Sequence, residues 1–254
     1  MDSISEGSVT TKIFEKFAEV TFYHPSANAL PSRLLAKLAK ALRDAGDDAT
    51  VHSVILRSAG DGAFCAGANF DELLAVDNEV EGKAFFSGFA GVILAIRNCP
   101  VPVLGRIHGK CVGGGVGLAA ACDYALATPA AMVKLSELAI GIGAYVIGPA
   151  VKRKTGVGAF AEISLRPDKW FDAAWARNNH LFAELVEQEE LDNRVEQIAG
   201  YWGSLQHSAL INWKKELWLD TAGWETLLFD NAAKSGSLLL APETRKILQG
   251  MKKR

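Results

Sequence analysis

The first half of the chain alternates strand-like and helix-like segments, and this alternation limits the possible folds more than any other feature. Residues 17–24 (FAEVTFYH) alternate and are rich in aromatic and β-branched residues, which is typical of a strand. Residues 32–46 carry leucines at helical spacing, residues 51–59 suit a buried strand, and residues 79–98 suit a long helix. A third strand is expected over residues 101–109. Short connections between such segments predict an α/β fold in which helices cover sheets.

The second half of the chain becomes mainly helical. Residues 124–135 suggest one further strand, and from about residue 156 helical periods dominate. No repeat or flexible linker divides the chain, so we expect a core domain over residues 1–195 and a helical region over residues 196–254. All six tryptophans lie beyond residue 169, which suggests packing between subunits or, equally, ordinary packing between helices.

Composition excludes several function classes. The chain has 254 residues, of which 49% are hydrophobic, so it can bury a large core. Its 27 basic and 29 acidic residues give a net charge of −2, and no overall field would attract nucleic acid or an anionic membrane. The first residues have no signal-peptide pattern, and no apolar run is long enough to span a bilayer. We therefore expect a cytoplasmic protein.

The cysteines and histidines suggest neither disulfides nor a metal site. The four cysteines lie in apolar or glycine-rich surroundings without paired C-x-x-C spacing, so we expect buried, reduced thiols. The five histidines are scattered and form no pair at helical spacing with an acidic neighbour.

Two glycine-rich loops, each followed by a helical pattern, carry the strongest chemical signal. They are residues 64–73 (FCAGANFDEL) and residues 108–118 (HGKCVGGGVGL). The first turn of a helix leaves N–H groups without partners, and small residues let a ligand approach them. Two such donors can form an oxyanion hole, although small residues also serve tight packing. A phosphate-binding loop is the weaker alternative, because neither nucleotide-binding glycine pattern is in register.

Together with residues 134–142 (KLSELAIGI), these loops resemble the crotonase superfamily, also called the enoyl-CoA hydratase/isomerase family. Residues 26–30 (SANAL) and residues 241–254 are similar to other parts of that family, so the resemblance covers nearly the whole chain. It implies a spiral of ββα units and a helical carboxyl-terminal trimerisation region, commonly within a hexamer. It also implies an acyl-CoA thioester as substrate, with no separate cofactor because CoA is part of the substrate.

The resemblance also assigns roles to individual residues. The N–H groups of Ala68 and Gly114 correspond to those that hold the thioester oxygen, which agrees with the oxyanion hole expected from the loops themselves. Ala29 and Ala66 correspond to positions that contact the adenine end of CoA.

The sequence departs from the family hydratases at one catalytic position. Those enzymes generally carry two glutamates, and here the first position is Gly117 while the second is Glu137. A single carboxylate suits double-bond migration better than hydration, because one base can remove a proton and return it nearby. The pattern is similar to that of Δ3,Δ2-enoyl-CoA isomerases. We expect burial to raise the pKa of Glu137, with apolar surroundings from its chain neighbours Leu135, Leu138, Ala139 and Ile140.

Other interpretations stay open at this point. Glu137 could be a surface or capping carboxylate, and the same loops would serve a hydratase, a thioester-enolate decarboxylase or hydrolase, or a non-catalytic acyl-CoA-binding scaffold. Tyr145 stands where the family has small residues, so it either projects into the acyl pocket or only packs. The basic residues 152–154 meet CoA phosphates or form a solvated turn.

Overall fold

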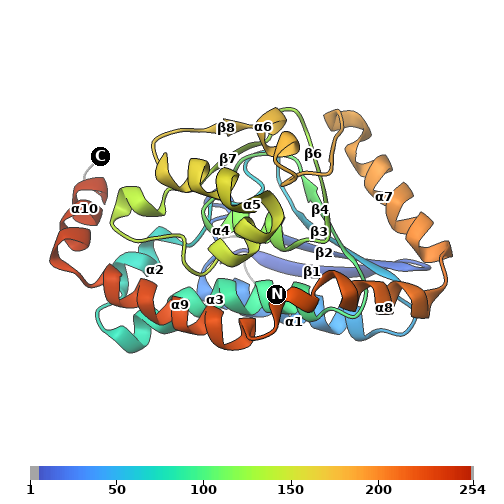
Figure 1. The fold of residues 1–254 in the computed structure, drawn as a ribbon, viewed down its shortest axis with the longest axis horizontal. Coiled ribbons are helices and arrows are strands. Elements are labelled where there is room, and N and C mark those ends of the chain that lie inside the picture. The colour runs from blue at the N-terminus through green and yellow to red at the C-terminus, as the bar shows by residue number, and fades with distance from the viewer. Residues whose placement is uncertain (1–5, 253–254) are drawn as a thin grey trace.

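The computed structural model describes residues 6–252 and confirms the predicted α/β fold with carboxyl-terminal helices (Figure 1). The strands are β1 (Ser8–Ile13), β2 (Phe17–Tyr23), β3 (Ser53–Ser58), β4 (Val103–Ile107), β5 (Cys111–Val112), β6 (Tyr124–Ala127), β7 (Met132–Lys134), β8 (Phe171–Asp172) and β9 (Glu184–Leu185). The α-helices are α1 (Ser32–Asp47), α2 (Phe70–Ala75), α3 (Glu79–Asn98), α4 (Gly114–Ala121), α5 (Gly148–Leu165), α6 (Ala173–Asn178), α7 (Gln188–Ser204), α8 (His207–Leu217), α9 (Trp224–Leu239) and α10 (Pro242–Lys252). The described residues also form the 3₁₀ turns η2 (Glu137–Ile140) and η3 (Leu219–Thr221).

The strands form two sheets. The larger has the order β1-β2-β3-β4-β6-β9, with β1 antiparallel to β2 and every other pair parallel. The smaller has the order β5-β7-β8. The single strand expected over residues 124–135 is therefore wrong, because β6 and β7 belong to different sheets. A turn containing Pro129 separates them, and the Ala131 N–H donates to the Thr128 carbonyl at 3.0 Å across it.

Helices cover both faces of the larger sheet. The leucines of α1 are buried against one face, as its apolar spacing predicts. On the other face, Ile55 and Leu104 pack with Leu191 and Val195 of α7 in a separate apolar cluster. The domain boundary expected after residue 195 thus falls inside α7, a helix that packs on the sheet.

Trimerisation through residues 196–254 stays a prediction.

The carboxyl-terminal helices return across the core. Helix α9 runs along α3, and the two come close where a Cβ on Gly82 would lie 2.8 Å from the Cα of Gly236. Trp218 and Trp224 are buried with their rings edge-to-face at 5.7 Å, whereas Trp213 is 64% exposed. Ordinary packing therefore accounts for the first two tryptophans.

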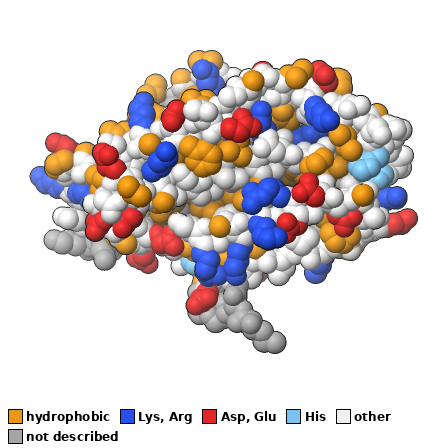
Figure 2. Space-filling model, turned by 90° about the horizontal axis from the view of Figure 1, so that it is seen from below, with side chains coloured by type: hydrophobic (Ala, Val, Ile, Leu, Met, Phe, Trp, Pro, Cys, Tyr) orange, Lys and Arg blue, Asp and Glu red, His pale blue; other side chains and the backbone are white. Residues whose placement is uncertain are grey.

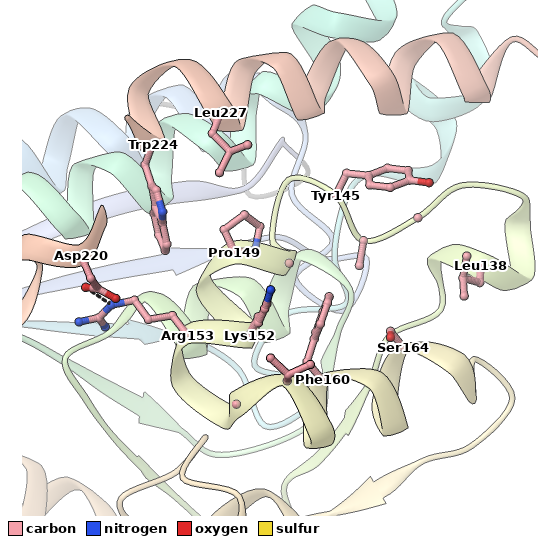
Figure 3. Close-up of a pocket in the computed structure, with 15 residues that line it drawn as sticks. Leu138, Tyr145, Pro149, Lys152, Arg153, Phe160, Ser164, Asp220, Trp224 and Leu227 are labelled. Atoms are coloured by element: carbon pink, nitrogen blue, oxygen red, sulfur yellow. Dashed lines mark hydrogen bonds and ion pairs between the residues drawn. The ribbon is translucent and has the colours of Figure 1, made fainter. Parts of the chain in front are cut away.

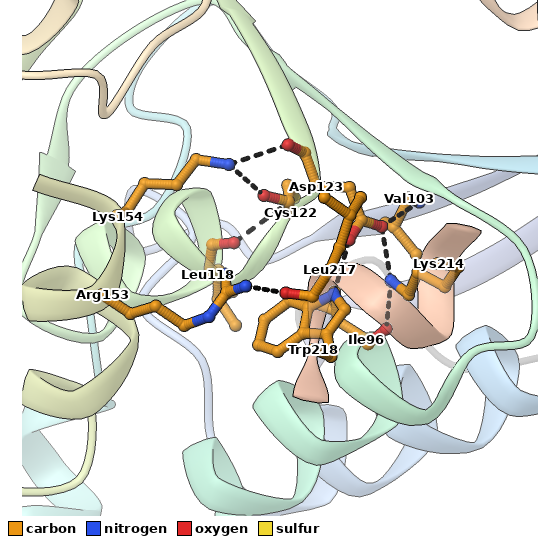
Figure 4. A network of polar contacts seen from close by, with 10 residues as sticks. All are labelled: Ile96, Val103, Leu118, Cys122, Asp123, Arg153, Lys154, Lys214, Leu217 and Trp218. Carbon is orange, nitrogen blue, oxygen red and sulfur yellow. Dashed lines mark hydrogen bonds and ion pairs between the residues drawn. The ribbon is translucent and has the colours of Figure 1, made fainter. Parts of the chain in front are cut away.

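A buried polar network fastens these helices to the core (Figure 4). Asp123 pairs with Lys214 of α8 and accepts hydrogen bonds from the Trp218 indole and the Val103 N–H, both at 2.7 Å. Lys214 also donates to the Ile96 carbonyl at 3.0 Å. These contacts give Asp123 a structural role, because they satisfy the buried charges of both Asp123 and Lys214.

Residues 152–154 lie in helix α5, so the expectation of a solvated turn is wrong. Lys154 donates to the carbonyls of Cys122 and Asp123 at 2.8 Å, and Arg153 donates to the Leu217 carbonyl and pairs with Asp220 at 3.0 Å. Two of the three cations are therefore occupied by protein groups.

On the face that Figure 2 shows, both signs of charge are present, and several Lys and Arg side chains lie close together in its lower middle. Acidic, basic and apolar side chains are interspersed over this face, which lies below α8 and α9 in the view of Figure 1. Within residues 6–252, no helix combines the length and the hydropathy needed to cross a membrane.

Candidate active site

The two glycine-rich loops are bonded to each other. The Cys65 N–H donates to the Lys110 carbonyl at 3.2 Å, and the Val112 N–H donates to the Cys65 carbonyl at 2.9 Å. A Cβ on Gly115 would lie 2.2 Å from the Cys65 carbonyl oxygen, so only glycine permits this approach. The loops therefore form one unit although about 45 residues separate them in the chain.

This unit presents two unpaired backbone donors. Within the described residues, the N–H groups of Ala68 and Gly114 have no protein acceptor. A Cβ on Gly67, the residue before Ala68, would lie 3.6 Å from the Gly114 nitrogen, and Ala68 and Gly114 line the same cavity. Gly113, with φ +50°, lets α4 begin at Gly114 with its amino terminus toward that space. The arrangement can stabilise a developing negative charge on one oxygen.

Both donors line a cavity of about 460 Å³ whose wall includes Glu137. Glu137 opens η2, and its Oε1 atom lies 2.9 Å from the place a Gly113 Cβ would take. Its Oε2 atom is buried without a hydrogen-bond partner among the described residues, and burial raises its pKa to about 7. Backbone hydrogen bonds at Glu137 and Ser136 lower this pKa, but burial outweighs them. Glu137 is therefore a carboxylate of the cavity wall rather than of the open surface.

The apolar surroundings of Glu137 come only in part from its chain neighbours. Ala139 and Ile140 line the same cavity as Glu137. Leu138 does not line this cavity and is 45% exposed. Leu135 is buried elsewhere in the core and does not line the cavity. The rest of the apolar wall is contributed by distant elements and includes Phe70, Phe85, Phe86, Phe89, Val112, Ile142 and Ile147.

Ile147 occupies the space beside the position where family hydratases have their first glutamate. Gly117 is buried in α4, and a Cβ there would lie 2.5 Å from the Cγ2 atom of Ile147. A carboxylate at this position would displace a core side chain. Glu137 is consequently the one carboxylate that lines the cavity in the described part of the chain. Sequence reasoning missed Ile147, because 30 residues separate it from Gly117.

The structure also places the other predicted binding residues at this cavity. Ala29 and Ala66 line it, and the Ala66 N–H donates to the Ala27 carbonyl at 3.2 Å. Neighbouring Asn28, at φ +56°, donates to the carbonyls of Ala59 and Ala63 at 3.1 and 2.9 Å, so it fixes the segment that presents Ala29. Contact of these residues with CoA stays a prediction.

Tyr145 lies on the cavity wall and is held from two sides. Its ring lies against Gly143, where a Cβ would be 2.7 Å from the ring, and the Lys234 ammonium lies 4.1 Å from the ring centroid. Its carbonyl accepts from the Asn231 side chain of α9 at 2.9 Å. Tyr145 therefore both packs and faces the cavity.

The cysteines of the two loops are poor nucleophiles. All four cysteines are buried and free, as predicted. Burial raises the pKa of Cys65 to about 12 and raises the pKa of Cys111 well above its ordinary value, so both thiols stay protonated at neutral pH. Among residues 6–252, no group of three or more histidine, cysteine or acidic side chains is placed to hold a metal ion.

This geometry agrees with a comparison against known protein families. A family model described as enoyl-CoA hydratase/isomerase matches residues 12–222. The chain belongs to the enoyl-CoA hydratase/isomerase family. The crotonase resemblance expected from the loops is thereby confirmed.

Relatives in this family carry several activities in their names. The chain is 31% identical over 198 residues to a (7aS)-7a-methyl-1,5-dioxo-2,3,5,6,7,7a-hexahydro-1H-indene-carboxyl-CoA hydrolase of Rhodococcus jostii (strain RHA1), covering 76% of this chain and 73% of the relative. It is 32% identical over 135 residues to a probable enoyl-CoA hydratase of Bacillus subtilis (strain 168), covering 53% of this chain and 52% of the relative. The chain thus spans about half the length of the second relative.

Solved structures of the family share the fold. An enoyl-CoA hydratase from Bacillus halodurans superimposes with a TM-score of 0.88 at 24% identity, covering 95% of this chain and 99% of that one. An enoyl-CoA hydratase/carnithine racemase from Magnetospirillum magneticum superimposes with a TM-score of 0.79 at 29% identity, covering 85% and 83%. At these identities the family's fold is shared while its reactions differ in name.

Proposed function

We propose that the protein is an acyl-CoA enzyme that moves the double bond of a 3-enoyl-CoA to the 2-position, with Glu137 as its single acid and base. The observation that carries this proposal is the side chain of Ile147 in the space beside Gly117. Hydration needs groups that position water and deliver a proton, and one carboxylate lines the cavity among the described residues.

The proposed reaction has two proton transfers. The thioester oxygen accepts hydrogen bonds from the N–H groups of Ala68 and Gly114. Glu137 then takes a proton from the carbon between the carbonyl and the double bond, and the electron pair of that C–H bond delocalises onto the thioester oxygen as a dienolate. The same carboxyl group returns the proton to the γ carbon. The 2,3 double bond forms, the 3,4 double bond is lost, and the carboxylate is regenerated.

A raised pKa suits both transfers. A carboxyl group with a pKa of about 7 is partly ionised at neutral pH, so it can accept the first proton. The ionised Glu137 side chain is a stronger base than an ordinary glutamate. Once protonated, it is an acid whose pKa lies near the ambient pH.

Hydrolysis of a C–C bond that releases a thioester enolate is the second candidate. It is supported by the Rhodococcus jostii relative, which is called a hydrolase of a carboxyl-CoA compound and is matched over most of both chains. The same two backbone donors would stabilise the enolate in that reaction.

The test compares reactions of the unmodified protein. We would incubate it separately with 3-enoyl-CoA and 2-enoyl-CoA thioesters and follow products by mass spectrometry and ultraviolet absorbance. The proposal predicts a 2-enoyl product of unchanged mass from the first substrate and negligible water addition to the second. Water addition to 2-enoyl-CoA without isomerisation would instead identify a hydratase, and turnover of neither would favour the hydrolase or scaffold interpretation.

A further inference from the structure

A second cavity adjoins the one that holds Glu137. It has a volume of about 740 Å³ and lies between α5 and the start of α9 (Figure 3). Gly143, Ala144 and Tyr145 line both cavities. Glu137 faces the smaller cavity and the next residue, Leu138, lines the larger. The far end of an acyl group that reacts at Glu137 would therefore meet this second space.

The wall of the second cavity exposes apolar side chains. Leu138 is 45% exposed, Val157 is 64% exposed and Leu227 is 42% exposed, and all three line this cavity. Phe160 covers Gly148, whose missing Cβ would lie 3.1 Å from the ring. Exposed apolar groups gathered around a concavity of this size are typical of a ligand site.

One cation on this wall is unpaired. Arg153 pairs with Asp220 at 3.0 Å, so these two charges balance each other. Lys152 is exposed, lines the cavity and has no acidic partner among the described residues. Figure 3 shows its ammonium directed into the space between α5 and α9. The Lys152 ammonium group is therefore available to interact with a ligand, and ammonium groups bind carboxylates.

Tyr145 forms the division between the two spaces. Gly143 on one side and Lys234 on the other hold its ring, and Asn231 holds its backbone. Because Tyr145 lines both cavities, an acyl group that extends from Glu137 to Lys152 would lie along this ring, which favours extended acyl groups over short ones.

We propose that the second cavity receives the distal end of the acyl group and that Lys152 pairs with a carboxylate carried there. The preferred substrates would be mono-CoA thioesters of dicarboxylic acids. This proposal rests on the proposed function for the position of the thioester at Glu137.

Binding of saturated esters tests the proposal without turnover. Calorimetry would measure the affinity of the wild-type protein for mono-CoA esters of straight-chain dicarboxylic acids, for esters of monocarboxylic acids of the same lengths, and for free CoA. We expect the dicarboxylic ester to bind about fivefold tighter at the best chain length. Lys152→Met should abolish this preference. Lys215→Met, which removes an exposed lysine of α8 that lines neither cavity, should retain it.

Three results would overturn the proposal. The first is equal affinity of the wild-type protein for both ester types at every length, and the second is a preference that survives Lys152→Met. The third is an equal loss of affinity for free CoA in Lys152→Met, which would assign Lys152 to CoA phosphates. If the carboxylate preference and its loss are observed but no enoyl-CoA is isomerised, the proposed function fails while the cavity assignment stands.

Discussion

At the scale of single residues, the chemistry depends on the buried carboxyl group of Glu137. Its Oε2 atom has no hydrogen-bond partner among the described residues, and burial disfavours the charged form. A base must be ionised to accept a proton, so activity is lost as the pH falls through the pKa. We predict that kcat/KM for isomerisation rises with pH through about 7 and then levels.

This profile is measured by initial rates across a pH series with one 3-enoyl-CoA. A midpoint near the ordinary glutamate value of about 4.3 would show that burial does not govern the base. A profile that falls with rising pH would show that the protonated form is the active one.

At the scale of elements, the two donors depend on close contact between the glycine loops. Gly115→Ala would put a Cβ 2.2 Å from the Cys65 carbonyl oxygen, and a backbone group cannot rotate away as a flexible side chain can. We predict a loss of about 1–3 kcal/mol in the free energy of unfolding, together with reduced isomerisation.

The matched control is Gly200→Ala in α7, where a Cβ would meet nothing within 4 Å. It should raise the free energy of unfolding by about 0.5–1 kcal/mol, because alanine favours the helix. Denaturant unfolding measures both variants. Equal stability of the two would mean that the loops can separate without cost.

The sequence pattern is sufficient to predict helices and strands whose ends are set by neighbouring residues in the chain. Helix α3 spans the expected residues 79–98, because Asn78 caps its first turn by accepting from the Glu81 N–H at 3.0 Å. The split of β6 from β7 was missed because it depends on which sheet each strand joins. Likewise, the two loops and Glu137 were predictable from the sequence, whereas Ile147 beside Gly117 required the folded chain.

At the scale of the whole molecule, the pair between Asp123 and Lys214 joins the carboxyl-terminal helices to the core. The two side chains are 5% and 2% exposed, so removing one charge leaves the other buried without a counter-charge (Figure 4). We predict that Asp123→Asn lowers the free energy of unfolding by about 3–5 kcal/mol.

Asp44→Asn is the comparison for this pair. Asp44 pairs with Lys40 on the surface of α1, where both side chains are at least 60% exposed, and its loss should cost less than about 1 kcal/mol. Denaturant titration of both variants separates the two cases. A cost below about 1 kcal/mol for Asp123→Asn would mean that the helices are held by apolar packing alone.

The assignment of Glu137 as the single acid and base is tested most directly by Glu137→Gln. The measurement is kcat/KM for isomerisation of a 3-enoyl-CoA by both proteins, with the affinity for a saturated acyl-CoA as a check that the cavity is intact. We predict a rate about 10²–10⁴ times lower with unchanged affinity. Isomerisation within a few-fold of the wild-type rate would contradict the account.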